Sequence, residues 1–237
     1  MPILQGKLKG QKWIVGSSIH GCWLGTYEYE KRKLFEKTIK KGCTVYDIGA
    51  HAGFYTLLSS ILVGPSGRVV AFEPNKRNVF FLKEHLRINR IRNVEVLEVA
   101  VSDHSGKSHF TEGSHHSMGH LIESPTVLDR NCAGKSIVEV ASVTIDELVQ
   151  EDRLLPPSYL KIDVEGGEAA VLRGGIATIA KSHPTIFLAT HGPSVSQECS
   201  HLLQTAGYVL QLIGQRSPDG CDEFVAWHPM RNREHCA

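Results

Sequence analysis

The sequence has no apolar run long enough to cross a bilayer, and no apolar core follows Lys7, Lys9 and Lys12 near the start. We therefore expect neither a membrane-spanning helix nor a secretory signal, and no membrane partner. Paired cysteines are also missing, because none of the six forms a C-x-x-C motif. A chain of 237 residues can fold without disulfides, so we expect reduced cysteines and a cytoplasmic location.

The chain has almost no net charge, since 26 basic and 25 acidic residues leave a formal value of +1. No whole-molecule field attracts it to nucleic acid or to anionic lipid. We therefore expect no nucleic-acid partner. The hydrophobic fraction of 41% and charged fraction of 22% are ordinary for a globular domain.

Internal repeats are absent, and from Thr44 onward short apolar strands alternate with amphipathic helices. This alternation predicts an α/β domain with a mostly parallel sheet and helices on both faces. Two strands in succession near the C-terminus predict one antiparallel strand there. The expected strands are 44–48, 68–72, 94–99, 136–143, 159–163, 185–189, 208–213 and 223–227. The expected helices begin at residues 53, 76, 145, 168 and 195, and Ser194 is expected to cap the last of them.

Two regions depart from this alternation. Residues 1–43 are interpreted as an N-terminal cap segment beside a Rossmann-like domain of residues 44–237, and a basic helix over 31–41 is expected to be a solvated face. The polar stretch 101–135 predicts a hairpin and loops. It holds five histidines, of which His116 and His120 have helical spacing, but the stretch lacks the pattern of a known metal site.

The most informative segment runs from Asp47 to Gly53, where the first strand meets the first helix. Ligands of open α/β sheets bind at this edge. Its glycines, Gly49 and Gly53, follow a G-x-x-x-G spacing and not the G-x-G-x-x-G of dinucleotide binders. S-adenosylmethionine carries no phosphate and needs no dense cradle of N–H groups, so the looser loop favours this cofactor.

Two acidic positions follow later strands. Glu73 ends the second strand, where a carboxylate can accept both hydroxyls of a ribose. Asp163 ends the strand 159–163, where an unpaired buried charge is costly. We expect Asp163 to contact the methionyl ammonium or to handle a proton of the acceptor.

Together, residues 45–56, 67–75 and 161–168 resemble the FkbM family of methyltransferases. The likeness extends to residues 25–28, 99–103, 143–148 and 190–192. The resemblance implies a seven-stranded class I methyltransferase fold and O-methylation of a sugar, a polyketide or a similar small molecule. It also implies cofactor contacts from Asp47, Gly49, Ala50, Gly53, Glu73 and Ala100, with Ser102 or Asp103 as alternatives at the adenine. We add His51 and Asp163 as further cofactor-binding candidates.

Methyl transfer to an alcohol benefits from a base within hydrogen-bond reach. We rank His191 first, then Asp163, then His51. Tyr27 and Glu28 are candidates for closing the site. No metal is expected, although a divalent ion held by Asp163, Glu165 and His191 is a less favoured alternative.

Three other functions stay open at this point. A nicotinamide-dependent oxidoreductase shares the first loop and the ribose acid, but the sequence lacks the third glycine of the fingerprint. A non-catalytic protein of the same fold would bind cofactor without turnover. An RNA methyltransferase is disfavoured by the near-neutral charge.

Overall fold

The structure is a computed structural model that describes residues 1–112, 119–122 and 136–231. Its main sheet has the strand order β10-β11-β9-β8-β1-β2-β3. All its pairs are parallel except those of β11, which runs antiparallel to β9 and β10. This confirms the predicted mostly parallel, seven-stranded sheet. The strands are β1 Thr44–Ile48, β2 Arg68–Phe72, β3 Val94–Leu97, β8 Tyr159–Ile162, β9 Thr185–Ala189, β10 Val209–Leu212 and β11 Glu223–Trp227.

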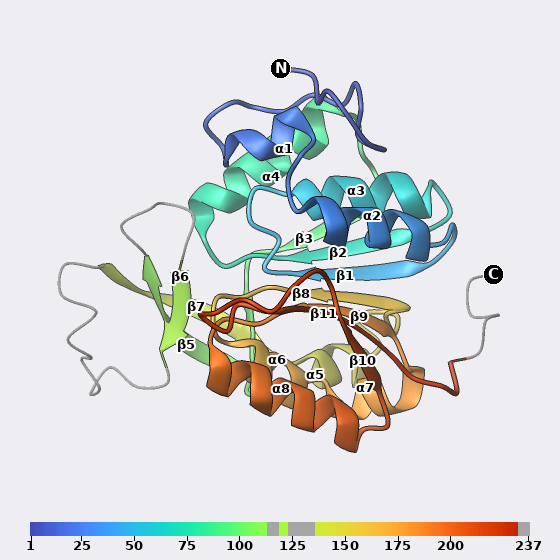
Figure 1. Ribbon diagram of the computed structural model, residues 1–237. Coiled ribbons are helices and arrows are strands. Elements are labelled where there is room, and N and C mark those ends of the chain that lie inside the picture. The colour runs from blue at the N-terminus through green and yellow to red at the C-terminus, as the bar shows by residue number, and fades with distance from the viewer. Residues whose placement is uncertain (113–118, 123–135, 232–237) are drawn as a thin grey trace.

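Helices cover both faces of this sheet, as predicted (Figure 1). One face carries α1 to α4 and the other carries α5 to α8. Successive side chains of a strand point to opposite faces. Val45 therefore joins the core beneath α3, whereas Tyr46 joins the core beneath α6. The helices are α1 His20–Leu24, α2 Tyr29–Thr38, α3 Phe54–Val63, α4 Lys76–Ile88, α5 Ile145–Gln150, α6 Glu168–Arg173, α7 Ile176–Ser182 and α8 Pro193–Thr205.

The N-terminal segment packs into the core on the α3 side. Trp13 is buried and stacks on His85 of α4, with ring centroids 3.9 Å apart. Ile3 and Leu8 belong to the same buried cluster as Leu57 of α3. Residues 1–43 thus share a hydrophobic core with the sheet, and the boundary placed after residue 43 stays a prediction.

A smaller sheet stands beside the main one, with the strand order β4-β7-β5-β6. The antiparallel pair β5–β6 lies where a hairpin was predicted. His120 is in strand β6, so the helical spacing that it shares with His116 does not reflect a helix; His115 and His116 lie outside the described residues. The strands are β4 Ala100–Val101, β5 Gly106–Glu112, β6 Gly119–Ile122 and β7 Ser136–Val143.

Two helix starts differ from the sequence-based expectation. Helix α7 was not predicted, because its first turn is capped by Asp146 of α5, whose carboxylate accepts hydrogen bonds from Ala177 N and Thr178 N. A cap from so distant a residue leaves no local signal. Helix α8 begins at Pro193 after Gly192, so Ser194 is not its cap. Proline suits a first helical position because the missing N–H would have no helical partner.

The cysteines correct one expectation. Cys22, Cys199 and Cys221 are free, but Cys43 is disulfide-bonded, so the prediction that all cysteines are reduced is wrong for Cys43. Within the described part of the chain, no helix combines the length and the apolar character required to span a membrane.

Candidate functional site

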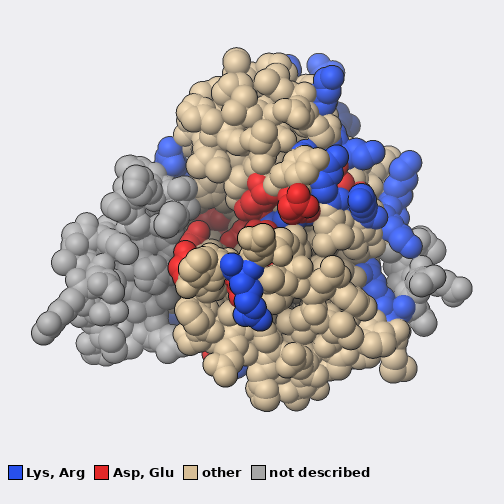
Figure 2. All heavy atoms as spheres, viewed as in Figure 1, with Lys and Arg blue, Asp and Glu red and all other residues tan. Residues whose placement is uncertain are grey.

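A cavity of about 270 Å³ opens at the carboxyl ends of β1, β2 and β8. Figure 2 shows that acidic side chains gather in the hollow between the upper and lower parts of this face. The N-terminal segment contributes to its wall through Trp13, Ile19, Tyr27 and Glu28. The strand ends therefore supply polar groups, and the N-terminal segment supplies aromatic and aliphatic side chains together with the carboxylate of Glu28. The main-domain lining includes Gly49, Ala50, His51, Phe54, Tyr55, Glu73, Asn78, Ala100, Lys161, Asp163, Glu165 and His191.

The loop after β1 passes tightly between its neighbours. Gly49 and Ala50 both donate backbone hydrogen bonds to the carbonyl oxygen of Phe72, each at 3.0 Å. Gly49 has a φ of 77°, and a Cβ there would collide with the carbonyl oxygen of Asp163. Only glycine fits such a position without strain. The loop is thereby held in place, with its backbone close to the cavity.

Glu73 presents a buried carboxylate to this cavity, with only 5% of its surface exposed. Its Oε1 accepts hydrogen bonds from Asn75 N and Asn78 Nδ2, at 3.0 and 3.2 Å. Its Oε2 accepts one from His51 N at 2.8 Å, which leaves capacity for a further donor. Burial raises the pKa of Glu73, and these hydrogen bonds oppose that rise.

Asp47 lies behind the cavity wall and is completely buried. Its Oδ2 accepts a hydrogen bond of 2.6 Å from the hydroxyl of Thr56 in α3. Its Oδ1 lies 3.4 Å from the ammonium of Lys161. Asp47 therefore supports the loop and is not among the residues that line the cavity.

Lys161 is the central charge of the site, and sequence reasoning missed it. This side chain of β8 donates a hydrogen bond of 2.9 Å to the carbonyl of Gly49 and lies 3.4 Å from Asp163 Oδ2. Burial alone would lower the pKa of Lys161, but the charges of Asp163 and Asp47 raise it. The signal was visible in the sequence, because a lysine interrupts an otherwise apolar, fully buried strand.

Lys31 extends this charged network into the N-terminal segment. It was expected to lie on a solvated face, but both Lys31 and the neighbouring Arg32 are buried. The ammonium of Lys31 pairs with Glu28, lies 2.6 Å from Glu223 and lies 3.9 Å from Asp163 Oδ2. Helix α2 is thus joined by charge to β8 and β11, and the solvated-face prediction is wrong at these two residues.

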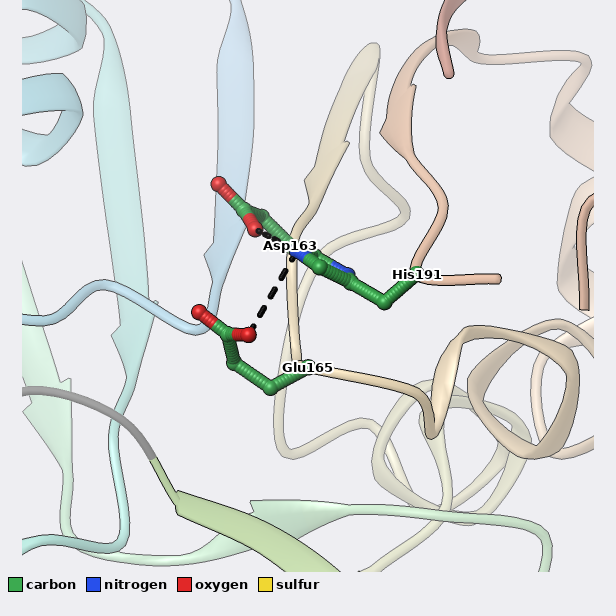
Figure 3. A group of neighbouring side chains, drawn as sticks. All are labelled: Asp163, Glu165 and His191. Atoms are coloured by element: carbon green, nitrogen blue, oxygen red, sulfur yellow. Dashed lines mark ion pairs between the residues drawn. The ribbon is translucent and has the colours of Figure 1, made fainter. Parts of the chain in front are cut away.

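The far side of the cavity holds His191, which follows β9, with Asp163 and Glu165 (Figure 3). The Nδ1 of His191 is 2.8 Å from Glu168 Oε1, while its Nε2 lies 3.8 Å from Asp163 and 3.5 Å from Glu165. Burial alone would lower the pKa of His191, but the hydrogen bond to Glu168 and the surrounding carboxylates raise it to about 9.

Glu168 is a second residue whose role was underestimated. It begins α6, where an acidic residue suits the helix dipole, yet it is completely buried. Besides holding His191, its Oε1 accepts hydrogen bonds from Val164 N and Gly166 N. One carboxylate thus fixes both the histidine ring and the loop that carries Glu165.

The structure brings most of the predicted site residues to one cavity. Asp47 and Gly53 are exceptions, because neither lines the cavity; a Cβ at Gly53 would strike the side chain of Leu82. Ser102 and Asp103 do not line the cavity, whereas Tyr27 and Glu28 do. The individual roles remain predictions. The residues that meet at the cavity are Gly49, Ala50, His51, Glu73, Ala100, Asp163 and His191.

Comparison with known proteins identifies the family. A model described as the methyltransferase FkbM domain matches residues 47–218. The chain belongs to the FkbM methyltransferase family. S-adenosyl-L-methionine is its cofactor, which removes the support for a nicotinamide enzyme.

Two similar methyltransferases match this chain over part of their own length. The ribosomal protein L11 methyltransferase of Acetivibrio thermocellus is 31% identical over 87 residues, which is 35% of this chain and 27% of that protein. The FkbM methyltransferase structure from Methylobacillus flagellatus KT has a TM-score of 0.56 at 19% identity, over 79% of this chain and 44% of that one. The chain therefore spans less than half of either protein.

A third similarity covers both chains almost fully. The precorrin-6y C5,15-methyltransferase structure from Geobacter metallireducens GS-15 has a TM-score of 0.55 at 16% identity, over 96% of this chain and 100% of that one. At identities this low, the structural similarity shows that the fold is shared and shows nothing further.

The cavity has polar groups that fit the cofactor. The Nε2 of His51 is buried without a hydrogen-bond partner among the described residues, although the ring lines the cavity. Glu73 Oε2 can accept one more hydrogen bond, as a ribose hydroxyl would supply. Glu73, His51 and the Gly49–Ala50 backbone are accordingly the groups that would hold the nucleoside.

Loss of the Lys161 charge is expected to destabilise the fold. Lys161→Met leaves the completely buried Asp47 without its cation and leaves Asp163 with the more distant ammonium of Lys31. Removing one partner of a buried ion pair costs about 3–5 kcal/mol. Urea denaturation of Lys161→Met should show this loss, whereas Lys107→Met, which removes an exposed partner of Glu139, should leave the midpoint unchanged. Equal midpoints for all three proteins would contradict the assignment.

Truncation of Glu73 is expected to weaken cofactor binding. Glu73→Ala removes the ribose acceptor, so the Kd for S-adenosylhomocysteine should rise at least tenfold, in line with about 1.5–3 kcal/mol for a hydrogen bond to a charged group. Isothermal titration calorimetry measures the change. Glu95→Ala is the matched control, since Glu95 lies on β3 and pairs with Arg68 away from the cavity. Undiminished affinity in Glu73→Ala would show that the ribose binds elsewhere.

Proposed function

We propose that this chain is an S-adenosylmethionine-dependent methyltransferase that methylates a hydroxyl group of a small molecule, such as a sugar or a polyketide. The observation that carries the proposal is the composition of one cavity. Glu73 on its wall suits a ribose, and Asp163, Glu165 and His191 on the same cavity suit a hydroxyl. A donor and an acceptor bound together there would lie side by side.

Orientation is the main contribution expected from the chain. The bound cofactor supplies a methyl group that its sulfonium already activates. Holding two reactants in line is worth roughly 7–11 kcal/mol of the barrier. Buried aromatic residues of the wall, Trp13, Phe54 and Tyr55, exclude water from this space.

Asp163 and His191 are the residues proposed to contact the acceptor hydroxyl. Burial would raise the pKa of Asp163, but Lys161, Lys31 and His191 hold it below its ordinary value. Asp163 is thus an ionised acceptor for the hydroxyl hydrogen. We place Asp163 before His191 as the proton acceptor, and we propose that His191, on the same cavity, helps to orient the acceptor oxygen.

A small acceptor is favoured over a nucleic acid by the charge of the cavity. Glu28, Asp163 and Glu165 line it, and these carboxylates would repel a phosphate backbone. The formal net charge of +1 adds no compensating attraction. The test of the proposed activity must distinguish methylation of a small molecule from methylation of RNA or of protein.

The cytoplasm remains the proposed location. The free thiols of Cys22 and Cys199 are typical of a reducing compartment. The disulfide at Cys43 is typical of an oxidising one, so it argues against this part of the proposal.

Transfer of a labelled methyl group tests the proposed activity. The purified chain is incubated with S-adenosylmethionine labelled in the methyl group and with a cell extract separated into small molecules, RNA and protein. We expect label in the small-molecule fraction, in a form that resists mild alkali as an ether does. Label confined to RNA or to protein, or no transfer despite cofactor binding, would contradict the proposal.

Substitution of His191 then connects transfer to the cavity. His191→Asn should lower the rate with the labelled fraction by about 10²-fold, the usual cost of misplacing a reacting group. Its affinity for S-adenosylhomocysteine should stay within about threefold. The control is His201→Asn, an exposed histidine of α8, which should transfer methyl groups at the original rate.

A further inference from the structure

Three potential ligand atoms converge on one side of the cavity (Figure 3). Asp163, Glu165 and His191 each offer one ligand atom, and these three atoms lie within 4.8 Å of one another. The Nε2 atom is 3.8 Å from the aspartate and 3.5 Å from the glutamate, beyond the usual hydrogen-bond range of about 2.7–3.2 Å. Bonds of about 2.1 Å to one octahedral ion would place its ligands about 3.0–4.2 Å apart. The two distances from Nε2 thus fall in the range expected for ligands that share a cation.

The histidine is held in the orientation that a metal ligand needs. Glu168 Oε1 is 2.8 Å from Nδ1 of His191, which directs the other ring nitrogen toward Asp163 and Glu165. Metal-binding histidines almost always have such a partner on the second nitrogen. Glu168 is completely buried, and its Oε2 has no hydrogen-bond partner among the described residues. This carboxylate therefore adds negative charge that hydrogen bonds do not fully compensate.

The charges around the three ligands favour a cation. The connected network has six carboxylates against two ammonium groups and the imidazole of His191, so carboxylates stay in excess even when the imidazole is counted as a cation. Lys31 and Lys161 approach Asp163 through Oδ2, which leaves Oδ1 toward His191. Neither lysine therefore takes the place of the cation. The carboxylates are those of Glu28, Asp47, Asp163, Glu165, Glu168 and Glu223.

We propose that Asp163, Glu165 and His191 bind one divalent cation of the Mn²⁺ or Mg²⁺ type. Mixed carboxylate and imidazole ligands suit Mn²⁺, and three protein ligands leave positions open for water and for an oxygen of the acceptor. This replaces the expectation that the site holds no metal, and the ion displaces to solvent any proton carried by Nε2 of His191. The part of the ion in acceptor binding rests on the proposed function, whereas its binding to the chain does not.

Titration of the full chain with Mn²⁺ tests the site directly. The protein is treated with a chelator, and free Mn²⁺ is measured by electron paramagnetic resonance without cofactor or acceptor. We expect one Mn²⁺ per chain, with the Kd at least tenfold higher in Glu165→Gln and in His191→Ala. Glu168→Gln should weaken binding about 10–100-fold, as loss of the partner of a metal-binding histidine does. His201→Ala should bind like the original chain.

Each outcome decides the proposal. Absence of bound Mn²⁺ in the original chain would overturn it, and so would an unchanged Kd in both Glu165→Gln and His191→Ala. Circular dichroism verifies that the variants are folded. If the variant of the buried Glu168 does not fold, Glu165→Gln still tests the site, because the side chain of Glu165 is 36% exposed. Mn²⁺ binding without any methyl transfer would overturn the proposed function and leave the metal site standing.

Discussion

The ammonium of Lys161, buried in the middle of a parallel sheet, is the charge around which the site is built. It contacts the carbonyl of Gly49 and the carboxylates of Asp47 and Asp163, so it links the ends of β1 and β8. A lone charge at this depth would be costly, and either carboxylate without the lysine would be equally so. The three groups can be buried only together, which fixes the cofactor loop relative to the residues proposed to face the acceptor.

The N-terminal segment depends on the same network. Lys31 of α2 brings a second buried ammonium to Asp163 and also pairs with Glu28 and Glu223. The segment that closes the cavity therefore also supplies a cation that compensates the carboxylates around it. A segment that closes a cavity with both aromatic side chains and a buried ion pair can influence which acceptors enter, and this connects the N-terminal segment to specificity.

Most of the architecture could be predicted from the sequence, because apolar strands and helix-stopping glycines are local signals. Strands β1 and β2 have the predicted bounds, and Glu73, Asp163 and His191 meet because strand ends share one edge of the sheet. The predictions that failed concern features that depend on residues far away in the sequence. The burial of Lys31 requires Asp163 and Glu223, and α7 requires the carboxylate of Asp146. Neither partner can be found from spacing along the chain.

A crystal structure of the chain with S-adenosylhomocysteine tests the central claim most directly. The account predicts the ribose hydroxyls within hydrogen-bond distance of Glu73, with the sulfur directed toward the side of the cavity that holds Asp163 and His191. A nucleoside bound outside this cavity would contradict the account, as would one lying inside it with the ribose turned away from Glu73.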